Sequence, residues 1–282
     1  MDPLRTRPPA APVTIPNDLS DRDFNALREL ALEQTGIHLD DSKRTMLYAR
    51  FTRRLRDLRL STFADYIQEI RRPGSPELSE FINTVTTNLT YFFREEHHFE
   101  FLRTEALPAL RQRAGAKALL RFWSAGCSSG EEPYSIAMTL NECRLKGAAD
   151  YRLLATDLDT EMINRTRAGR FRMSSIRGLT DERRKLWFDQ RDGQLVAKAP
   201  LREGLIIRQL NLFGSWPLQN PVDVIFCRNV LIYFTRDDQV RVIRQFSRHQ
   251  LSGGLLFLGH SESIRGLDDL YERISNTVYR RL

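Results

Sequence analysis

Cysteine is scarce in this chain. The three present, Cys127, Cys143 and Cys227, are odd in number and have no C-x-x-C spacing, so the sequence predicts neither a disulfide framework nor a zinc site. No apolar run approaches the roughly 20 residues that span a bilayer. The first 18 residues contain five prolines where a signal peptide needs an apolar core. We therefore expect reduced thiols, a cytoplasmic location and no insertion into a membrane.

Lysine is also rare, since it supplies only five of the 43 basic residues. The net charge is nevertheless +7. That balance favours an acidic partner without choosing among a nucleic acid, a membrane surface and an acidic protein. With 282 residues, 41% of them hydrophobic, the chain is long enough to bury one large core or two modest ones.

The chain divides into three parts by composition. Residues 1–18 are a Pro-rich segment that we expect to be a flexible tail, and residues 19–90 have helical periodicity without a convincing strand. Within 41–60, apolar residues fall on one helical stripe, and Arg50, Arg53 and Arg56 project from the opposite side. This basic face is either simply solvated or a docking surface for a carboxylate-rich partner helix, because arginine pairs bidentately with carboxylates.

Residues 91–282 alternate between strands and helices, which indicates an α/β fold with a mostly parallel sheet. A final pair of strands, 271–274 and 278–281, reads as an antiparallel hairpin at the sheet edge. A small antiparallel insertion is expected at about 187–210. The predicted parallel strands are 119–125, 153–158, 205–210, 222–227 and 255–259.

The stretch RFWSAGCSSGEEPYS, residues 121–135, reads as a buried strand, a glycine-rich turn and the start of a helix. Gly126 and Gly130 permit a close approach of the backbone. Glu131 and Glu132 stand at the helix start, where a dinucleotide fold would present a bare N-terminus to a pyrophosphate. Two negative charges there favour a ligand with a cationic amine and a ribose but no phosphate. S-adenosylmethionine is the common cofactor of that description.

Polar residues follow several predicted strands, where a cofactor crevice would lie. Asp157 stands 31 residues beyond Gly126, and it is a candidate acceptor for the ribose hydroxyls. Asn211 could bond an adenine edge. Arg228 and Asn229 follow the fourth strand, above the expected reaction centre.

A second polar group, Asn88, Thr90 and Arg94, lies where the helical and α/β parts join, which is a common place for a pocket. The adjacent His97 and His98 suggest a metal at first sight. Neighbours on a helix diverge by about 100 degrees, however, and no acidic residue has ligand spacing. We predict no metal.

Five segments together resemble the chemotaxis protein-glutamate O-methyltransferases, the CheR-type family that esterifies receptor glutamates with S-adenosylmethionine. They are TTNLTYFFRE, AGCSSGEEPYS, ATDLDTEMINRTRAG, FCRNVLIYF and GGLLFLGHSES. The resemblance implies a class I methyltransferase domain, doubly wound, behind an all-α N-terminal domain. It also implies that Arg94 and Tyr233 border the reacting carboxylate. The implied cofactor-site residues are Asn88, Thr90, Arg94, Glu132, Asp157, Asn211, Leu212, Arg228 and Asn229.

Esterification of a glutamate needs no general base, because the reference pKa of the side chain is about 4.3. Catalysis would come from alignment and desolvation, and the product S-adenosylhomocysteine is expected to bind well. The implied partners are the cytoplasmic methylation helices of chemotaxis receptors. Family members that bind a receptor C-terminal peptide do so by strand addition to the small antiparallel subdomain. Here the corresponding segment, RDGQLVAKAPLREG, is short, so we expect the enzyme to engage the methylation region directly, through Arg50, Arg53 and Arg56.

Two rival functions remain open at the level of sequence. A nucleic-acid methyltransferase would use the positive charge, but CRNVLIYF stands where an amino-group methyltransferase usually has an N/D-P-P-Y/F tetrapeptide. The second rival is a non-catalytic cofactor sensor or scaffold.

Overall fold

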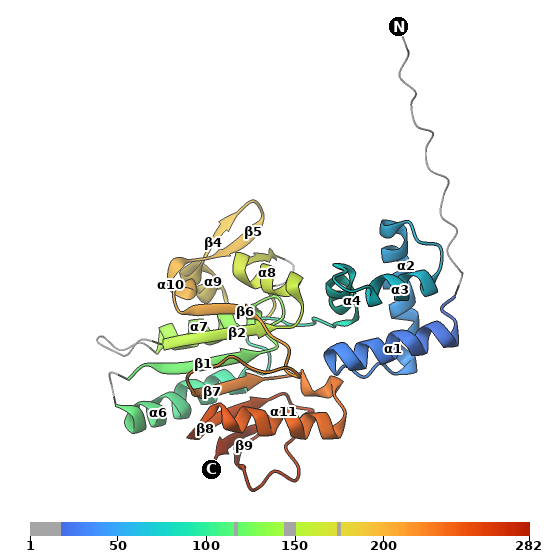
Figure 1. Ribbon diagram of the computed structural model, residues 1–282. Coiled ribbons are helices and arrows are strands. Elements are labelled where there is room, and N and C mark those ends of the chain that lie inside the picture. Colours follow the sequence, from blue (N-terminus) through green and yellow to red (C-terminus); the bar gives the residue numbers. More distant parts are fainter. Residues whose placement is uncertain (1–17, 116–117, 144–150, 174–175) are drawn as a thin grey trace. The chain divides into compact units, whose positions relative to one another are not determined.

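A computed structural model describes residues 18–115, 118–143, 151–173 and 176–282 (Figure 1). The described chain forms two compact units. One holds the residues up to Gln34 together with His38–Val85, and the other holds Thr35–Ile37 and Thr86–Leu282. All but one residue of the predicted tail lies outside the described residues, so its flexibility stays a prediction.

The first unit is all-helical, as predicted. Its first helix begins as the sequence indicates, because Ser20 Oγ accepts the Asp23 N–H at 3.1 Å and donates to the Asp23 carboxylate at 2.6 Å. Phe51 is fully buried between Tyr66 and Phe81. The elements are α1 (Asp21–Thr35), a 3-10 turn (Asp41–Lys43), α2 (Arg44–Leu58), α3 (Phe63–Arg71) and α4 (Glu77–Val85).

The second unit contains, among the described residues, a seven-stranded sheet in the order β6-β2-β1-β7-β8-β10-β9. The first five strands in that order are parallel, and β10 and β9 run antiparallel as the expected terminal hairpin. This confirms the predicted fold class. The strands are β1 (Leu120–Ala125), β2 (Tyr151–Asp157), β6 (Leu205–Gln209), β7 (Val222–Cys227), β8 (Gln250–Leu258), β9 (Tyr271–Ser275) and β10 (Val278–Arg281).

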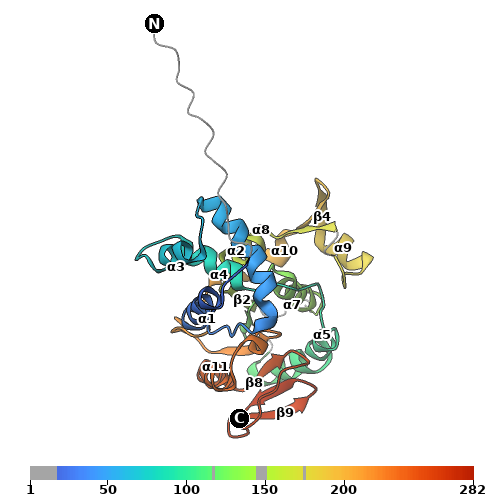
Figure 2. The ribbon, with the colours of Figure 1, turned by 90° about the vertical axis from the view of Figure 1, so that its right-hand side faces the viewer.

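Helices cover both faces of this sheet. Figure 2 shows α11 on one side of β8, with α5 and α7 on the other. The helical elements are α5 (His97–Phe101), a π-helical turn η2 (Leu102–Ala106), α6 (Leu107–Ala114), α7 (Glu131–Glu142), α8 (Thr160–Ala168), α9 (Asp181–Trp187), α10 (Ala199–Arg202), a 3-10 turn η4 (Leu231–Tyr233) and α11 (Arg236–Arg248).

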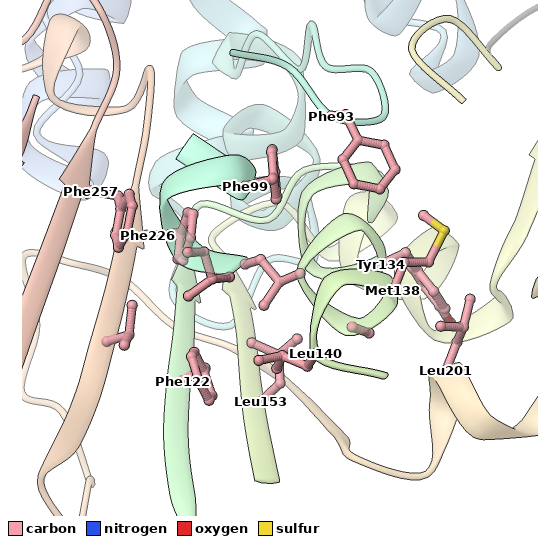
Figure 3. Packing of buried hydrophobic residues seen from close by; sticks show 14 of the residues in the cluster. Phe93, Phe99, Phe122, Tyr134, Met138, Leu140, Leu153, Leu201, Phe226 and Phe257 are labelled. Atoms are coloured by element: carbon pink, nitrogen blue, oxygen red, sulfur yellow. The ribbon is translucent and has the colours of Figure 1, made fainter. Parts of the chain in front are cut away.

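Neighbouring strand residues alternate between two buried clusters, which is why the strands read as continuous apolar runs. Phe122, Phe226 and Phe257 face the α7 side and belong to one buried cluster with α7 side chains such as Leu140 (Figure 3). Trp123 faces the α11 side, as do Ile225 and Leu256, and the Trp123 ring contacts Phe246 of α11. Apolar side chains therefore cover both faces of the central strands β1, β7 and β8.

The small antiparallel sheet is present, but its predicted boundaries of about 187–210 are wrong. It has the order β3-β5-β4, formed by β3 (Arg170–Arg172), β4 (Phe188–Arg191) and β5 (Gln194–Ala197). The strand at 205–209 belongs to the main sheet, where it pairs with β2 in parallel. β3 has only three residues, so it carries too little alternation for a sequence pattern to reveal it.

None of the described helices is long and apolar enough to cross a membrane.

Candidate active site at the carboxyl ends of the strands

The glycine-rich turn after β1 is fixed to the end of β2. The N–H groups of Gly126 and Cys127 both donate to the Thr156 carbonyl at 2.8 Å. Gly126 has a φ of +91°, a left-handed conformation that favours glycine. A Cβ atom on Gly126 would also lie 2.4 Å from the Val230 side chain. The turn is therefore closed by its own chain on that side, and glycine is required there by backbone shape and by packing.

Asp157 lies beside this turn, at the carboxyl end of β2. Its Oδ2 accepts the Ser128 N–H at 2.7 Å, and its Oδ1 accepts the Asp159 N–H at 3.0 Å. Burial raises the pKa of Asp157 to about 6, against the opposing effect of these hydrogen bonds. Each oxygen keeps a second lone pair, so the carboxylate can still accept hydroxyl protons.

Asp159 connects the start of α8 to Thr86 and Asn88. The sequence did not indicate this residue. Its Oδ1 caps α8 by accepting the N–H groups of Glu161 and Met162. Its Oδ2 accepts the Thr86 hydroxyl at 2.7 Å and the Asn88 amide at 2.8 Å. Asn88 thus reaches the end of β2 although it lies 71 positions away in the chain. A sequence pattern can predict the helix cap, but it cannot predict the hydrogen bonds to Thr86 and Asn88.

Glu132 stands in the first turn of α7 and is buried. Ser124 Oγ donates to its Oε1 at 2.7 Å, and Arg228 Nη1 lies 3.1 Å from its Oε2. Burial raises the pKa of Glu132, and the Arg228 charge opposes that rise. The carboxylate expected to meet the ammonium of the cofactor is therefore already paired with a guanidinium, which the sequence did not predict.

Arg228 contacts a second carboxylate, that of Glu95, whose Oε2 lies 3.5 Å from Nη2. Nη2 also donates to the Arg94 carbonyl. Glu95 Oε1 in turn accepts from His260, at 3.1 Å from the ring Nδ1. Two carboxylates thus share one guanidinium in this network. One excess negative charge is left when both are ionised.

The premise that no acidic residue has ligand spacing is wrong, because Glu95, His97 and His98 bring three ligand-type atoms within 4.8 Å of one another. The buried His98 ring lies 2.8 Å from the Thr277 hydroxyl, and burial lowers its pKa to about 3. Arg228 approaches the same Glu95 oxygen that faces His98, so a guanidinium competes with any ion for that ligand. The prediction of no metal stays a prediction, and this cation argues for it.

The charge of Arg94 acts on the Tyr233 hydroxyl. The Arg94 guanidinium donates to the Leu89 carbonyl at 2.8 Å, and half-buried Thr90 is the next residue. Burial raises the pKa of Tyr233, which ends the η4 turn, and the Arg94 charge lowers it. The two residues therefore influence each other electrostatically, although 139 positions separate them in the chain.

The remaining predicted cofactor residues follow β6 and β7. Asn211 Oδ1 accepts the Phe213 N–H at 2.9 Å, which makes a tight turn after β6. Leu212 is 8% exposed and packs with Trp216. Asn229 follows Arg228 with a φ of +59°. Their roles toward a cofactor stay predictions.

The three arginines of the helical unit differ in their surroundings. Arg50 is half-buried and donates to the Thr84 carbonyl at 2.7 Å, near the end of α4. Arg53 and Arg56 are exposed on α2. Arg54, their neighbour, forms a bidentate pair with buried Glu77 at 2.6 Å. Arg50 therefore contributes to the packing of its own unit, and Arg53 and Arg56 are the members that stand in solvent.

A mostly parallel sheet with a terminal antiparallel hairpin, a glycine turn after β1 and an acid at the end of β2 defines a class I S-adenosylmethionine-dependent methyltransferase. Comparison with known families agrees with that class. Residues 88–280 match the family described as CheR methyltransferase, SAM binding domain, and residues 22–86 match CheR methyltransferase, all-alpha domain. The chain belongs to the CheR methyltransferase family.

Curated relatives are similar over most of their length. A probable chemotaxis protein methyltransferase of Rhizobium etli is 38% identical over 87% of this chain and 94% of its own. The chemotaxis protein methyltransferases of Klebsiella aerogenes and Escherichia coli are 40% and 39% identical, each over 93% of this chain, and over 90% and 91% of their own lengths. A solved structure, the plantazolicin methyltransferase BpumL in complex with SAH, aligns with a TM-score of 0.33 and 13% identity over 68% of this chain and 55% of that chain, a likeness too low to add an argument.

Family membership confirms the expected cofactor and activity. The chain is an S-adenosylmethionine-dependent chemotaxis methyltransferase of the protein-glutamate type.

Proposed function

We propose that this chain esterifies glutamates on the cytoplasmic methylation helices of chemotaxis receptors, with Arg94 and Tyr233 bordering the reacting carboxylate. The observation that supports the proposal is that the Arg94 charge acts on Tyr233, whose 3-10 turn follows β7 and Arg228. When bound, S-adenosylmethionine supplies a methyl group on a cationic sulfonium.

The charges around Arg228 fit such a cofactor. The two carboxylates of Glu95 and Glu132 carry more negative charge than the Arg228 guanidinium neutralises. Their net negative charge attracts a cation and repels a phosphate. Asp157, at the other side of the glycine turn, offers two oxygens that suit a ribose diol. The donor set therefore matches a ligand that carries an ammonium and a ribose.

Arg94 and Tyr233 would orient the incoming glutamate. A guanidinium clamped on the attacking oxygen would lower its nucleophilicity, so we assign Arg94 to orientation of a carboxylate, that of the glutamate or that of the cofactor. The Tyr233 hydroxyl and ring would border the methyl group. Arg94→Ala and Tyr233→Phe should each lower kcat more than the affinity for S-adenosylhomocysteine; unchanged turnover in both would remove them from the mechanism.

Arg53 and Arg56 are the proposed contacts to an acidic receptor helix, since they are exposed on one helix one turn apart. Arg50 belongs to the same proposal less strongly, because it already bonds Thr84. Binding of a receptor C-terminal peptide to the small sheet is not part of the proposal. An assay with isolated receptor tails tests that exclusion, and tight binding would contradict it.

Transfer of a labelled methyl group from S-adenosylmethionine to receptor protein, followed by mild alkali, tests the proposed function. A glutamate ester releases volatile methanol under these conditions. An N-methyl product, as a nucleic-acid or amine methyltransferase would make, retains its label, and a scaffold gives no label at all. Either of these outcomes contradicts the proposal.

The product S-adenosylhomocysteine should bind comparably and inhibit, because most contacts do not depend on the sulfonium charge. Calorimetry that gave much weaker binding for the product than for the methyl donor would contradict this expectation.

A further inference from the structure

Glu262 places a buried carboxylate against four consecutive backbone N–H groups. The Asn229 N–H donates to Oε2 at 2.9 Å, and those of Val230, Leu231 and Ile232 donate to Oε1 at 2.9, 2.7 and 3.3 Å. A fifth N–H, that of Gly259, donates to Oε2 at 2.6 Å. Glu262 is 6% exposed. Its carboxylate therefore acts as an anion bound inside a backbone concavity.

The segment that Glu262 holds, residues 229–232, links two parts of the candidate site. It follows Arg228 and leads into Tyr233, the last residue of η4. Its first residue has a left-handed backbone, and its N–H groups point to one side instead of pairing along a strand. Buried N–H groups need an acceptor, so this conformation depends on the carboxylate.

The same segment also borders the glycine turn. The Val230 side chain fills the space where Gly126 would otherwise have a Cβ atom. A shift of residues 229–232 would therefore move Tyr233 and loosen the cover of that turn together. Displacements of about 1 Å in positioning elements can cost about a hundredfold in rate.

We propose that Glu262 is a positioning residue for methyl transfer: its carboxylate fixes residues 229–232 and thereby sets the place of the Tyr233 hydroxyl. This inference rests on the proposed function, in which Tyr233 borders the reacting groups. Glu262 acts through the backbone, because every contact that it makes to residues 229–232 is to a main-chain N–H.

Two substitutions disturb this arrangement in different ways. Glu262→Gln keeps the size of the side chain but replaces one acceptor oxygen with an NH₂ group. That NH₂ group would face backbone N–H groups, which are also donors. Gly259→Ala keeps the charge, but its Cβ would lie 2.8 Å from Glu262 Oε2 and, on Asn229, 2.6 Å from Nδ2 and 2.9 Å from the backbone nitrogen. The alanine variant displaces the carboxylate without neutralising it. It therefore tests whether Glu262 fixes residues 229–232 even if Glu262→Gln does not fold.

A matched control lies at the opposite end of β7. Asp223 is buried at the start of that strand, accepts the Arg121 N–H at 2.9 Å and pairs with Arg113 at 3.3 Å. Asp223→Asn also removes a buried charge from the same unit. A purely structural effect of such a loss should therefore appear in this control as well.

The first readout is backbone hydrogen exchange of the peptide covering 228–234, measured in the full chain without cofactor. In Glu262→Gln or Gly259→Ala we expect exchange about tenfold faster in this peptide, with Asp223→Asn unchanged there. Unchanged exchange in a folded variant would overturn the inference, whether or not the chain methylates receptors.

The second readout is kcat for receptor methylation at saturating cofactor and receptor. We expect kcat to fall about ten- to a hundredfold in Glu262→Gln. The double variant Glu262→Gln/Tyr233→Phe should lose no more activity than the worse of the two single variants, because both substitutions disturb the same hydroxyl group. Losses that multiply, a normal kcat, or a loss equal to that of Asp223→Asn would each overturn the inference. A wild-type chain that forms no ester would refute the proposed function separately, and hydrogen exchange would still decide whether Glu262 holds the segment.

Discussion

Replacement of Arg228 by methionine should destabilise the methyltransferase unit severely. The arginine side chain is 1% exposed and lies between the carboxylates of Glu132 and Glu95, at 3.1 and 3.5 Å. Methionine keeps much of the volume and the contact with the Phe99 ring, over which the guanidinium now lies. It removes the cation, however, and leaves two buried carboxylates facing each other.

Removal of one partner of a buried ion pair costs about 3–5 kcal/mol, because the remaining charge is left without compensation. For a domain of this size, each kcal/mol lowers the Tm by about 2–4 °C, so the expected loss is roughly 6–20 °C. The same substitution at Arg165 is the control. That arginine pairs with Glu161 on the surface, where both side chains are more than half exposed, and such pairs contribute about 0–1 kcal/mol.

The loss should depend on pH, and its sign follows from Glu132. Burial raises the pKa of this carboxyl group even in the presence of Arg228, so removal of the arginine raises the pKa further. An acid with a raised folded-state pKa is stabilised by protonation and loses that stability as the pH rises through the folded pKa. The variant should therefore be closer to the wild type at pH 5 than at pH 7.5. Glu132→Gln should restore part of its stability at pH 7.5.

Urea unfolding followed by circular dichroism, at both pH values and without cofactor, measures these differences. A loss below about 1 kcal/mol for Arg228→Met, or the same loss at pH 5 and pH 7.5, would refute the reasoning. The first result would mean that the two carboxylates find other partners, and the second that they are not ionised in the variant.

Three further predictions concern the rest of the site. Gly126→Ala should cost about 1–3 kcal/mol in urea unfolding, because its φ is +91° and the new Cβ would meet Val230 at 2.4 Å; an unchanged midpoint would contradict the close packing. The affinity for S-adenosylhomocysteine, measured by calorimetry, should fall as the pH is lowered through about 6, the pKa of Asp157, because a protonated carboxyl group accepts hydroxyl protons poorly; Asp157→Asn should flatten this dependence, and an equal dependence in the variant would assign it to another group. Arg53→Glu combined with Arg56→Glu should raise the KM for receptor with little change in kcat, and an unchanged KM would remove these arginines from the receptor contact.

The sequence sufficed for features that are local. The capping pair Ser20 and Asp23, the strand, turn and helix around Gly126, and the acid that closes β2 all depend on residues within a few positions of one another. Their physical causes are capping, periodicity and backbone conformation, and each of these leaves a short pattern. The three-residue strand β3 left none, and the insertion was misplaced for that reason.

The candidate site depends on contacts that no local pattern records. Residue identity marked Glu132 and Arg228 as site residues, but nothing in the sequence showed that they pair with each other across 96 positions. The acceptor role of Glu262 was likewise hidden, because its partners are backbone N–H groups, which every residue except proline offers. A sequence indicates such residues only when they belong to a motif formed by neighbouring residues.

The hidden contacts change what the cofactor can be expected to meet. Read alone, Glu131 and Glu132 suggested two free negative charges at the start of α7. In the structure Glu131 accepts from Ser129 at 2.6 Å, and Glu132 is shared with Ser124 and Arg228. The attraction for a cation therefore comes from the excess charge of the whole network. Because Arg228 sets that excess, its loss would disturb the stability of the fold and the charge of the pocket at the same time.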